Sequence, residues 1–251
     1  MPVLTRSLIG LWRLARMGGH ITTGVITIWL KFGRMGHEER NRAVERWAGK
    51  LMQLCGIELR VLGAVPQQGP LLIVANHLSW LDIPAIHAAR HCRFVSKSDV
   101  KAWPVIGGLA SAAGTLFIER NSRRDAMRTV SRMEETMRNG DMVAVFPEGT
   151  TGDGQQLLPF HANLLQSAIA AEAPVLPLGL CFYDKHSGRM SSAPSYVGDE
   201  SLLGSIWRTV TAPPLVAQLN YGEPQSSAGR NRRDWSAELQ EAVDQLRQVQ
   251  R

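Results

Sequence analysis

Short apolar runs alternate with amphipathic stretches between about residue 38 and residue 225. Runs of about four to eight apolar residues bounded by turn residues predict buried strands, and apolar residues spaced three or four apart predict helices. The predicted strands are 57–61, 71–75, 93–96, 115–118, 142–146, 175–182 and 215–221. The predicted helices are 38–55, 84–90, 125–137, 161–172 and 234–251. Strands that alternate with helices favour an α/β fold, which we expect to be a single mixed, largely parallel sheet flanked by helices.

The same pattern divides the chain into three parts. Residues 1–36 form an N-terminal helical segment, residues 37–225 form the α/β domain, and residues 226–251 carry a C-terminal helix. The stretch 183–205 shows neither helical nor strand periodicity, so we predict that it is irregular.

The N-terminal segment has the pattern of a membrane-surface helix, with apolar and basic residues on different faces. The apolar residues are Leu4, Leu8, Leu11, Trp12 and Ala15, and the basic residues are Arg6, Arg13 and Arg16. A second apolar stretch, 21–30, follows Gly18 and Gly19 and is shorter than the roughly 20 residues that span a bilayer. We therefore predict amphipathic helices that associate with a membrane. Two ordinary helices packed on the core are the alternative.

Charge and cysteine content narrow the choice of partners. A net charge of +6 and a pI of about 9.6 predict an anionic partner, such as nucleic acid, a membrane surface or an acidic substrate. The chain has no groove-reading motif, which argues against nucleic acid. The three cysteines lie far apart and form no Cys-x-x-Cys pair. This argues for a reducing compartment and against a disulfide framework or a thiolate zinc site.

Two polar groups of residues each follow an apolar run. The sequence NHLSWLD at 76–82 follows the run 71–75, and FPEGT at 146–150 follows another. Polar residues at the ends of strands in one sheet predict a single site at one sheet edge. A histidine held by a carboxylate is a general base that works near neutral pH, and the first group supplies His77 and Asp82.

The spacing of His77 and Asp82 decides how they can meet. Five positions leave them about 140° apart on a helix, so we expect His77 on the turn before the helix and Asp82 near its first turn. Pro84 is compatible with that first turn. Asp82 could then bond the His77 ring and fix its tautomer, or it could simply cap the helix. Ser79 also permits a Ser-His-Asp hydrolase, but the chain lacks a Gly-x-Ser-x-Gly elbow, and we expect a turn residue.

Four blocks in order resemble the family of bacterial 1-acyl-glycerol-3-phosphate acyltransferases and related glycerolipid acyltransferases. They are NHLSWLD at 76–82, GTLFIER at 114–120, FPEGT at 146–150 and VLPL at 175–178. Segments between them, at 97–98, 103–107 and 157–160, are also similar to the family. The resemblance covers about residues 45–225.

The resemblance implies acyl transfer from a thioester to the hydroxyl of a lysolipid. His77 would remove the hydroxyl proton as the oxygen attacks the thioester carbonyl, and Asp82 would support it. Because the acceptor is itself the nucleophile, no covalent acyl-enzyme is needed. We expect no cofactor or metal, and the donor would be acyl-CoA or acyl-carrier protein. We expect the protein at the cytoplasmic face of the inner membrane, peripheral or monotopic.

The second and third blocks supply candidates for substrate binding. Arg120 has the planar fork that suits a phosphate, unless it is only a surface arginine. Glu148 is expected to face the acceptor, with backbone N–H groups of Gly149 and Thr150 exposed beside it. The alternative is a tight turn in which Glu148 bonds only the local backbone.

Three further residues are expected to support the site. Asn76 precedes the histidine in the first block, and Lys97 could contact the phosphates of the donor or be solvated. Pro177 would shape the floor of the site or interrupt an edge strand. The histidines that we predict to be structural or surface residues are His87, His91 and His161.

The third block departs from the family, because many members that acylate lysophosphatidate continue it with an arginine and a serine. Here Thr150 is followed by Thr151 and Gly152. Losing an arginine contact to a charged group would cost roughly 1.5–3 kcal/mol. Lysophosphatidate, giving phosphatidate, is the predicted acceptor, and lyso-ornithine lipid, which carries no phosphate, is the alternative. A non-catalytic lipid- or acyl-carrier-binding protein is a second alternative, which the presence of both His77 and Asp82 opposes.

Overall fold

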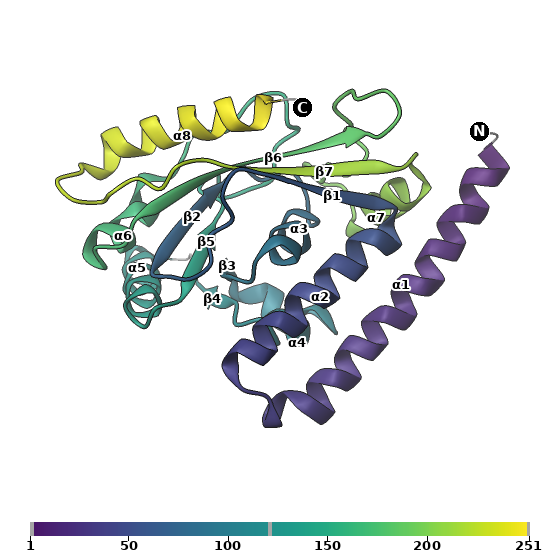
Figure 1. Ribbon diagram of the computed structural model, residues 1–251, viewed down its shortest axis with the longest axis horizontal. Helices are drawn as coiled ribbons and strands as arrows, with labels where there is room; N and C mark the ends of the chain where they lie inside the picture. The colour runs from purple at the N-terminus through teal and green to yellow at the C-terminus, as the bar shows by residue number, and fades with distance from the viewer. Residues whose placement is uncertain (1–2, 120–121, 250–251) are drawn as a thin grey trace.

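The computed structural model describes residues 3–119 and 122–249, and its centre is a seven-stranded sheet (Figure 1). The strands are β1 (Ile57–Leu62), β2 (Leu71–Ala75), β3 (Arg93–Lys97), β4 (Leu116–Ile118), β5 (Met142–Val145), β6 (Val175–Asp184) and β7 (Leu215–Tyr221). Their order in the sheet is β1-β7-β6-β2-β5-β3-β4. Neighbouring strands run parallel except β6 and β7, which are antiparallel. The predicted mixed, largely parallel sheet is confirmed.

Helices cover both faces of this sheet (Figure 1). One face carries α2 (His37–Cys55), α3 (Asp82–Ala89) and α7 (Leu202–Thr211), with α1 (Val3–Lys31) packed outside against α2 and α7. The opposite face carries α5 (Arg123–Arg138), α6 (Gln166–Ala170) and α8 (Arg232–Gln248). The remaining helices are α4 (Ile106–Ala112) and the 3-10 helices η1 (Phe32–Arg34), η2 (Ser98–Ala102) and η3 (Ala162–Leu165).

Strand β2 shows why the sequence of a central strand is apolar at every position. All five of its residues are buried. Successive side chains of a strand point to opposite faces, so Ile73 enters the core beneath α2 and α3, while Leu72 and Val74 enter the core beneath α5, α6 and α8. The turn that follows β2 therefore starts from a strand that is buried on both faces.

The N-terminal segment is one continuous helix of 29 residues, where the sequence suggested two segments separated at Gly18 and Gly19. Each glycine costs a helix only about 1 kcal/mol relative to alanine. Tertiary contacts on both sides of the glycines offset that cost. Gly24 lies against the Trp47 ring of α2, and Gly10 lies against α7.

Two further predictions differ from the structure. The helix expected at 161–172 is divided into η3 and the short α6. The stretch predicted to be irregular contains the start of α7, at Leu202. The side chain of Ser201 caps this helix by accepting the Gly204 N–H at 3.1 Å, which is a helix-start signal that the sequence contains.

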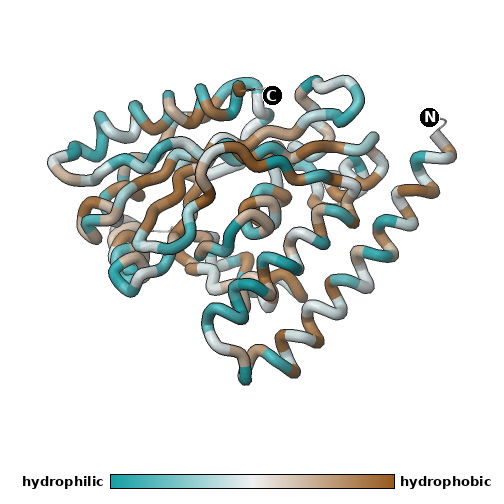
Figure 2. The backbone as a smooth tube through the Cα atoms, in the orientation of Figure 1, coloured by the Kyte–Doolittle hydropathy of each residue, from teal (hydrophilic) through white to brown (hydrophobic). Residues whose placement is uncertain are grey.

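The central strands of the sheet and the N-terminal helix differ in their hydropathy patterns (Figure 2). The central strands are uniformly apolar, whereas apolar and polar residues alternate along α1 (Figure 2). Within residues 3–119 and 122–249, no helix combines the length and the apolar character that crossing a bilayer requires.

Candidate active site

The turn between β2 and α3 carries the histidine and the aspartate of the first sequence block. Strand β2 ends at Ala75 and α3 begins at Asp82, so His77 lies on the turn and Asp82 is the first helical residue, as the spacing predicted. His77 Nδ1 and Asp82 Oδ2 are 2.7 Å apart. The Asp82 side chain is fully buried and the His77 side chain is 19% exposed, so the pair meets solvent only through the imidazole.

Asp82 also holds the turn itself. Its Oδ2 accepts the backbone N–H groups of Leu78 at 2.6 Å and Ser79 at 2.8 Å. The carboxylate therefore does both things that the sequence allowed as alternatives, because it orients the histidine and closes the turn that begins α3. An ionised carboxylate only accepts hydrogen bonds, which assigns the proton of the His77 ring to Nδ1 and the lone pair to Nε2.

Ser79 serves the turn, as expected. It is fully buried, and its hydroxyl accepts the Leu81 N–H at 3.2 Å. Among the described residues, no hydrogen bond joins the Ser79 hydroxyl to the His77 ring. The arrangement therefore lacks the serine–histidine contact of a hydrolase triad.

The third sequence block lies directly beside the first, because β5 pairs with β2. The Phe146 ring stacks on the His77 ring, with 3.9 Å between centroids and 6° between planes. This stacking fixes the plane of the imidazole. No residue of the described chain hydrogen-bonds His77 Nε2, so this is the ring atom available to a substrate.

Glu148 bridges two backbone segments. Its Oε1 accepts the His77 N–H at 2.7 Å, and its Oε2 accepts the Leu158 N–H at 2.9 Å. Burial raises the pKa of this carboxyl group, while the two backbone bonds and the nearby His77 oppose that rise. The sequence suggested a carboxylate facing the acceptor or a local turn. Both oxygens instead accept N–H groups distant in sequence, because folding brings the two segments to this buried carboxylate.

The loop after Glu148 also contacts the histidine turn. Gly149 adopts a φ of 73°, and its N–H bonds the Phe146 carbonyl at 3.0 Å, which turns the chain. The Gly152 N–H then donates to the His77 carbonyl at 2.8 Å. The His77 backbone is thus held at its N–H by Glu148 and at its carbonyl by this loop. The Thr150 side chain is exposed.

A segment outside all four sequence blocks completes the contacts of the turn. The Tyr196 N–H donates to the Leu78 carbonyl at 3.0 Å. The Thr151 hydroxyl donates to the Tyr196 carbonyl. Thr151, at the position where the resemblance led us to expect an arginine, therefore joins two segments of the protein.

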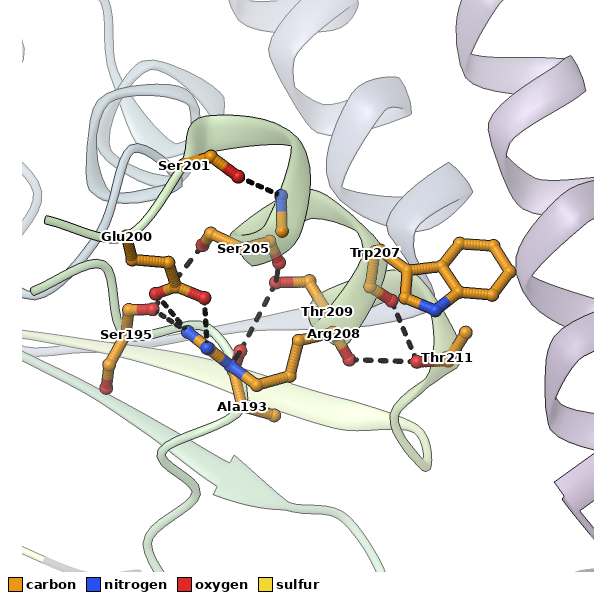
Figure 3. Close-up of polar contacts among 10 residues, drawn as sticks. Ala193, Ser195, Glu200, Ser201, Ser205, Trp207, Arg208, Thr209 and Thr211 are labelled. Carbon is orange, nitrogen blue, oxygen red and sulfur yellow. Dashed lines mark hydrogen bonds and ion pairs between the residues drawn. The ribbon is translucent and has the colours of Figure 1, made fainter.

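Helix α7 holds the segment that contains Ala193 and Ser195 (Figure 3), and Tyr196 follows directly in the sequence. Arg208 forms an ion pair with Glu200 and donates to the carbonyls of Ala193 and Ser195. The contact to Ala193 is 2.9 Å from Nε. One arginine therefore holds the chain on both sides of residue 194, just before it reaches the active-site turn.

Comparison with known proteins identifies the family. The Acyltransferase family model matches residues 56–181, a range that contains all four sequence blocks. The chain belongs to the acyltransferase family. The family expected from the blocks is thereby confirmed, and the protein is an O-acyltransferase.

Individual relatives of this acyltransferase carry two kinds of name. A lyso-ornithine lipid O-acyltransferase of Pseudomonas aeruginosa is 34% identical over 93% of this chain and 91% of that protein. A 1-acyl-sn-glycerol-3-phosphate acyltransferase of Neisseria meningitidis is 40% identical over 73% of this chain and 72% of that protein. The crystal structure of the 1-acyl-sn-glycerophosphate acyltransferase PlsC of Thermotoga maritima has a TM-score of 0.73 and 20% identity, covering 98% and 95% of the two chains. That likeness shows a shared fold.

Asn76 supports the acyltransferase site through the backbone. Its side-chain amide is fully buried and exchanges two hydrogen bonds with Leu180, one to the carbonyl at 2.9 Å and one from the N–H at 2.7 Å. These bonds extend the pairing of β2 with β6 past the end of the ladder at Ala75. The point at which His77 leaves the sheet is therefore fixed.

The structure does not bring Pro177 to the site. Pro177 is paired with Val74, three residues before His77, which places it about 10 Å back along the sheet. It is buried within β6, which lies between β7 and β2, so it does not interrupt an edge strand either. The pairing of β6 with β7 begins only at Leu178, so the missing N–H of Pro177 removes no bond from that ladder.

Lys97 lies at the same sheet edge as His77. It is the exposed last residue of β3, two strands from β2, or roughly 10 Å across the sheet. Arg120 lies outside the described residues. Strand β4, which ends at Ile118, reaches the same edge beside β3.

The sequence did not predict three contacts of the site. They are made by Phe146 with the His77 ring, by Leu158 with Glu148, and by Tyr196 with the Leu78 carbonyl. Phe146 and Leu158 lie in segments that were recognised as similar to the family, but nothing in them predicts a ring stack or a bond to Glu148. For Tyr196 we find no signal in the sequence, because its contact is made by the backbone.

Proposed function

We propose that this acyltransferase transfers a fatty acyl group from a thioester to the free hydroxyl of 1-acyl-glycerol-3-phosphate, giving phosphatidate. The observation that carries the proposal is the His77–Asp82 pair, with Nδ1 bonded to a buried carboxylate and Nε2 left for a substrate. The buried turn and the stacked Phe146 ring hold the imidazole in place before the substrate arrives.

The proposed chemistry is one displacement at the thioester carbonyl. His77 Nε2 takes the proton of the acceptor hydroxyl while its oxygen forms a bond to the carbonyl carbon. The carbon–sulfur bond then breaks, and the imidazolium returns the proton to the thiolate that leaves. Asp82 stabilises the imidazolium in between, since its carboxylate touches the protonated Nδ1. We propose acyl-CoA or acyl-carrier protein as the donor, with no bound cofactor or metal.

Lysophosphatidate is the acceptor that we propose first, because basic residues stand, in the sequence, at or just after the ends of two strands that share a sheet edge with His77. Lys97 is exposed at this edge, and Arg120 follows β4 in the sequence. An ammonium group such as that of Lys97 suits a phosphate monoester, and the resemblance implies a phosphate-binding role for Arg120. Both oxygens of Glu148 accept backbone N–H groups, one of them that of His77 itself. We propose that it positions His77.

Lyso-ornithine lipid is a second candidate acceptor, which two observations favour. Thr151 replaces the arginine of many phosphate-directed members, and its hydroxyl is bonded to the Tyr196 carbonyl. In addition, the relative that matches 93% of this chain is named for acylation of lyso-ornithine lipid.

The test is a donor-consumption assay with purified protein in detergent, with lysophosphatidate and lyso-ornithine lipid offered side by side. We expect thiol release with lysophosphatidate, and none from a folded His77→Ala variant. Faster release with lyso-ornithine lipid would replace the first acceptor by the second. A folded wild-type protein that releases no thiol with either acceptor would contradict acyl transfer to both and favour a binding protein.

We also propose that α1 places the protein on a membrane, at the cytoplasmic face of the inner membrane, as a peripheral or monotopic protein. The helix is continuous, so residues from both apolar stretches of the sequence share one face, within an arc of about 100°. The exposed large apolar residues in this arc are Leu4, Leu8, Leu11, Trp12, Ile26, Trp29 and Leu30. Tryptophan and leucine on a surface helix are typical of an interfacial anchor.

Arg13 does not belong to a membrane-facing basic surface, although the sequence grouped it with Arg6 and Arg16. Its guanidinium is partly buried and donates to the carbonyls of Val210 at 2.8 Å and Ala212 at 3.2 Å. These carbonyls lie at the C-terminal end of α7, where a cation satisfies groups that the helix leaves free. Arg13 therefore joins α1 to α7.

Vesicle sedimentation tests the membrane proposal. The double variant Leu8→Glu/Trp29→Glu should weaken binding to vesicles of phosphatidylglycerol and phosphatidylcholine by more than about 100-fold, because two large apolar side chains lose their burial in lipid. Met127→Glu is the matched control, since Met127 is also an exposed large apolar residue but lies on α5. Equal binding by the double variant and the control would contradict the proposed surface.

A further inference from the structure

The last turn of α8 carries a buried arginine that lies outside the sequence blocks and outside the residues matched by the family. The Arg247 side chain is only 5% exposed, although it lies four residues from the end of the chain. A buried guanidinium is costly unless its donors are satisfied. The contacts of this side chain therefore show what it is there to hold.

The backbone around Arg247 is fixed to the sheet. Three carbonyls at the end of α8 accept hydrogen bonds from side chains of β6 and β7. The pairs are Leu246 with Asn220 at 3.0 Å, Arg247 with Cys181 at 2.8 Å, and Val249 with Gln218 at 2.5 Å. Gly179 of β6 permits this close approach, because a side chain there would overlap the Arg247 backbone. The backbone at the end of α8 is thus held against β6 and β7.

From the end of α8 the guanidinium of Arg247 extends to the loop that follows the third sequence block. Its Nη1 donates to the Gly154 carbonyl at 2.5 Å, and its Nη2 donates to the Gln155 carbonyl at 3.1 Å. Asp244, one turn earlier on α8, accepts from Nε at 2.6 Å and orients the fork. Two consecutive carbonyls are therefore bound by one planar group, which suits arginine and not lysine.

The bound carbonyls lie between the two points at which this loop supports the catalytic turn. Gly152 donates to the His77 carbonyl, and Leu158 donates to Glu148, whose other oxygen accepts the His77 N–H. The loop from 149 to 158 contains no helix or strand of its own. Arg247 supplies two hydrogen bonds that fix its middle from outside.

We propose that Arg247 is a positioning residue for the acyl transfer, which acts on His77 through the loop 149–158. The inference rests on the proposed function, in which His77 is the base. A purely structural role is the competing explanation, in which Arg247 only fastens α8 to the molecule. The two differ in what a substitution changes. A positioning role changes the turnover of folded enzyme, whereas a structural role changes only the fraction that is folded.

The test compares Arg247→Ala, Arg247→Lys and Arg233→Ala in the full-length protein. Arg233 is an exposed residue at the other end of α8 and serves as the matched control. We expect kcat per folded molecule to fall about 100-fold in Arg247→Ala and about tenfold in Arg247→Lys, with KM changed less than about twofold, because a small misplacement of a base costs this much. Added guanidinium ion at millimolar concentration should restore part of kcat in Arg247→Ala, and equal sodium chloride should not.

Amide hydrogen exchange gives a readout that does not depend on activity. The Gly152 and Leu158 amides should exchange faster in both Arg247 variants than in Arg233→Ala, while amides of β2 stay protected. Wild-type kcat in folded Arg247→Lys and Arg247→Ala would overturn the inference, as would unchanged exchange at these amides. An inactive wild-type protein with faster loop exchange in the variants would instead overturn the proposed function and leave the loop contact standing.

Discussion

Two histidines of this acyltransferase, ten residues apart, show opposite environments. His77 lies on the turn before α3, partly exposed, with Nδ1 bonded to Asp82. His87 lies within α3, buried, and its Nδ1 has no hydrogen-bond partner in the described part of the chain. Both rings belong to one aromatic column, since His77 stacks on Phe146, Phe146 on Phe94, and Phe94 meets His87 edge-on.

The difference teaches what makes an imidazole a base. Burial, with a smaller effect from the neighbouring His91, lowers the pKa of His87 to about 3, so its ring stays neutral and serves the core. A catalytic base must become an imidazolium during the reaction. Of these two histidines, His77 has both a carboxylate to stabilise that cation and an open nitrogen to receive the proton. Partners and access, not residue type, separate the two roles.

The largest effect should come from removing the base. His77→Ala should lower kcat by more than about 1000-fold, because the acceptor hydroxyl loses its proton acceptor. The variant should still fold, since Asp82 keeps its hydrogen bonds to the Leu78 and Ser79 N–H groups. Thiol release by folded protein is the measurement. Turnover near the wild-type rate would show that His77 is not the catalytic base, despite its carboxylate partner and open nitrogen.

Removing the partner of His77 should make it resemble His87. Asp82→Asn keeps the shape but replaces the negative charge by a neutral amide, which stabilises an imidazolium much less, so kcat should fall about 100- to 1000-fold. A small residual activity should remain, because the ring still stacks on Phe146. If Asp82→Asn retained more than half of wild-type kcat, Asp82 would be only a cap of the turn.

Because His87 is buried in its neutral form, the protein should lose stability at acidic pH. The unfolded chain protonates this histidine below about pH 6.5, whereas the folded protein does so only near the lowered pKa of about 3. The free energy of unfolding should therefore fall as the pH drops, by about 3 kcal/mol between pH 7 and pH 4.5 from this residue.

The substitution His87→Leu should abolish that part of the acid sensitivity, as measured by urea unfolding at both pH values. His91, whose pKa is also lowered by burial and which lies near Glu45 and Arg93, will leave a smaller dependence. The control is His161→Gln, since His161 is exposed. Parallel loss of stability in His87→Leu and wild type would contradict the neutral, buried ring.

The smallest effect concerns the support behind His77. In Glu148→Gln one amide must replace a carboxylate that accepts two N–H groups, so one of them loses its acceptor at a cost of about 1–3 kcal/mol. We expect about a tenfold loss of kcat. Because burial raises the pKa of Glu148 in the folded state, wild type should also lose stability relative to the variant as the pH rises above about 4.5. Matching pH profiles of unfolding would contradict this.

Much of the fold and part of the site could be predicted because they depend on neighbours in sequence. Periodicity gave all seven strands and the largely parallel sheet. The five-residue spacing of His77 and Asp82 gave their placement on the turn and in the first helical position. The acyltransferase family followed from four blocks in order. Predictions that failed, such as a break at Gly18 and Gly19, concerned segments whose shape is set by packing against other helices.

The sequence alone determined which residues can do the chemistry, His77 and Asp82, and that they follow a strand. It could do so because hydrophobic periodicity and a five-residue spacing depend only on residues close together in the sequence. Only the tertiary structure determined which residues hold His77 and Asp82 in place. Glu148, Tyr196 and Arg247 act through backbone N–H and carbonyl groups. Every residue except proline has both groups, so these contacts do not restrict the side chain at the receiving position. Contacts of that kind become visible only when distant segments are brought together.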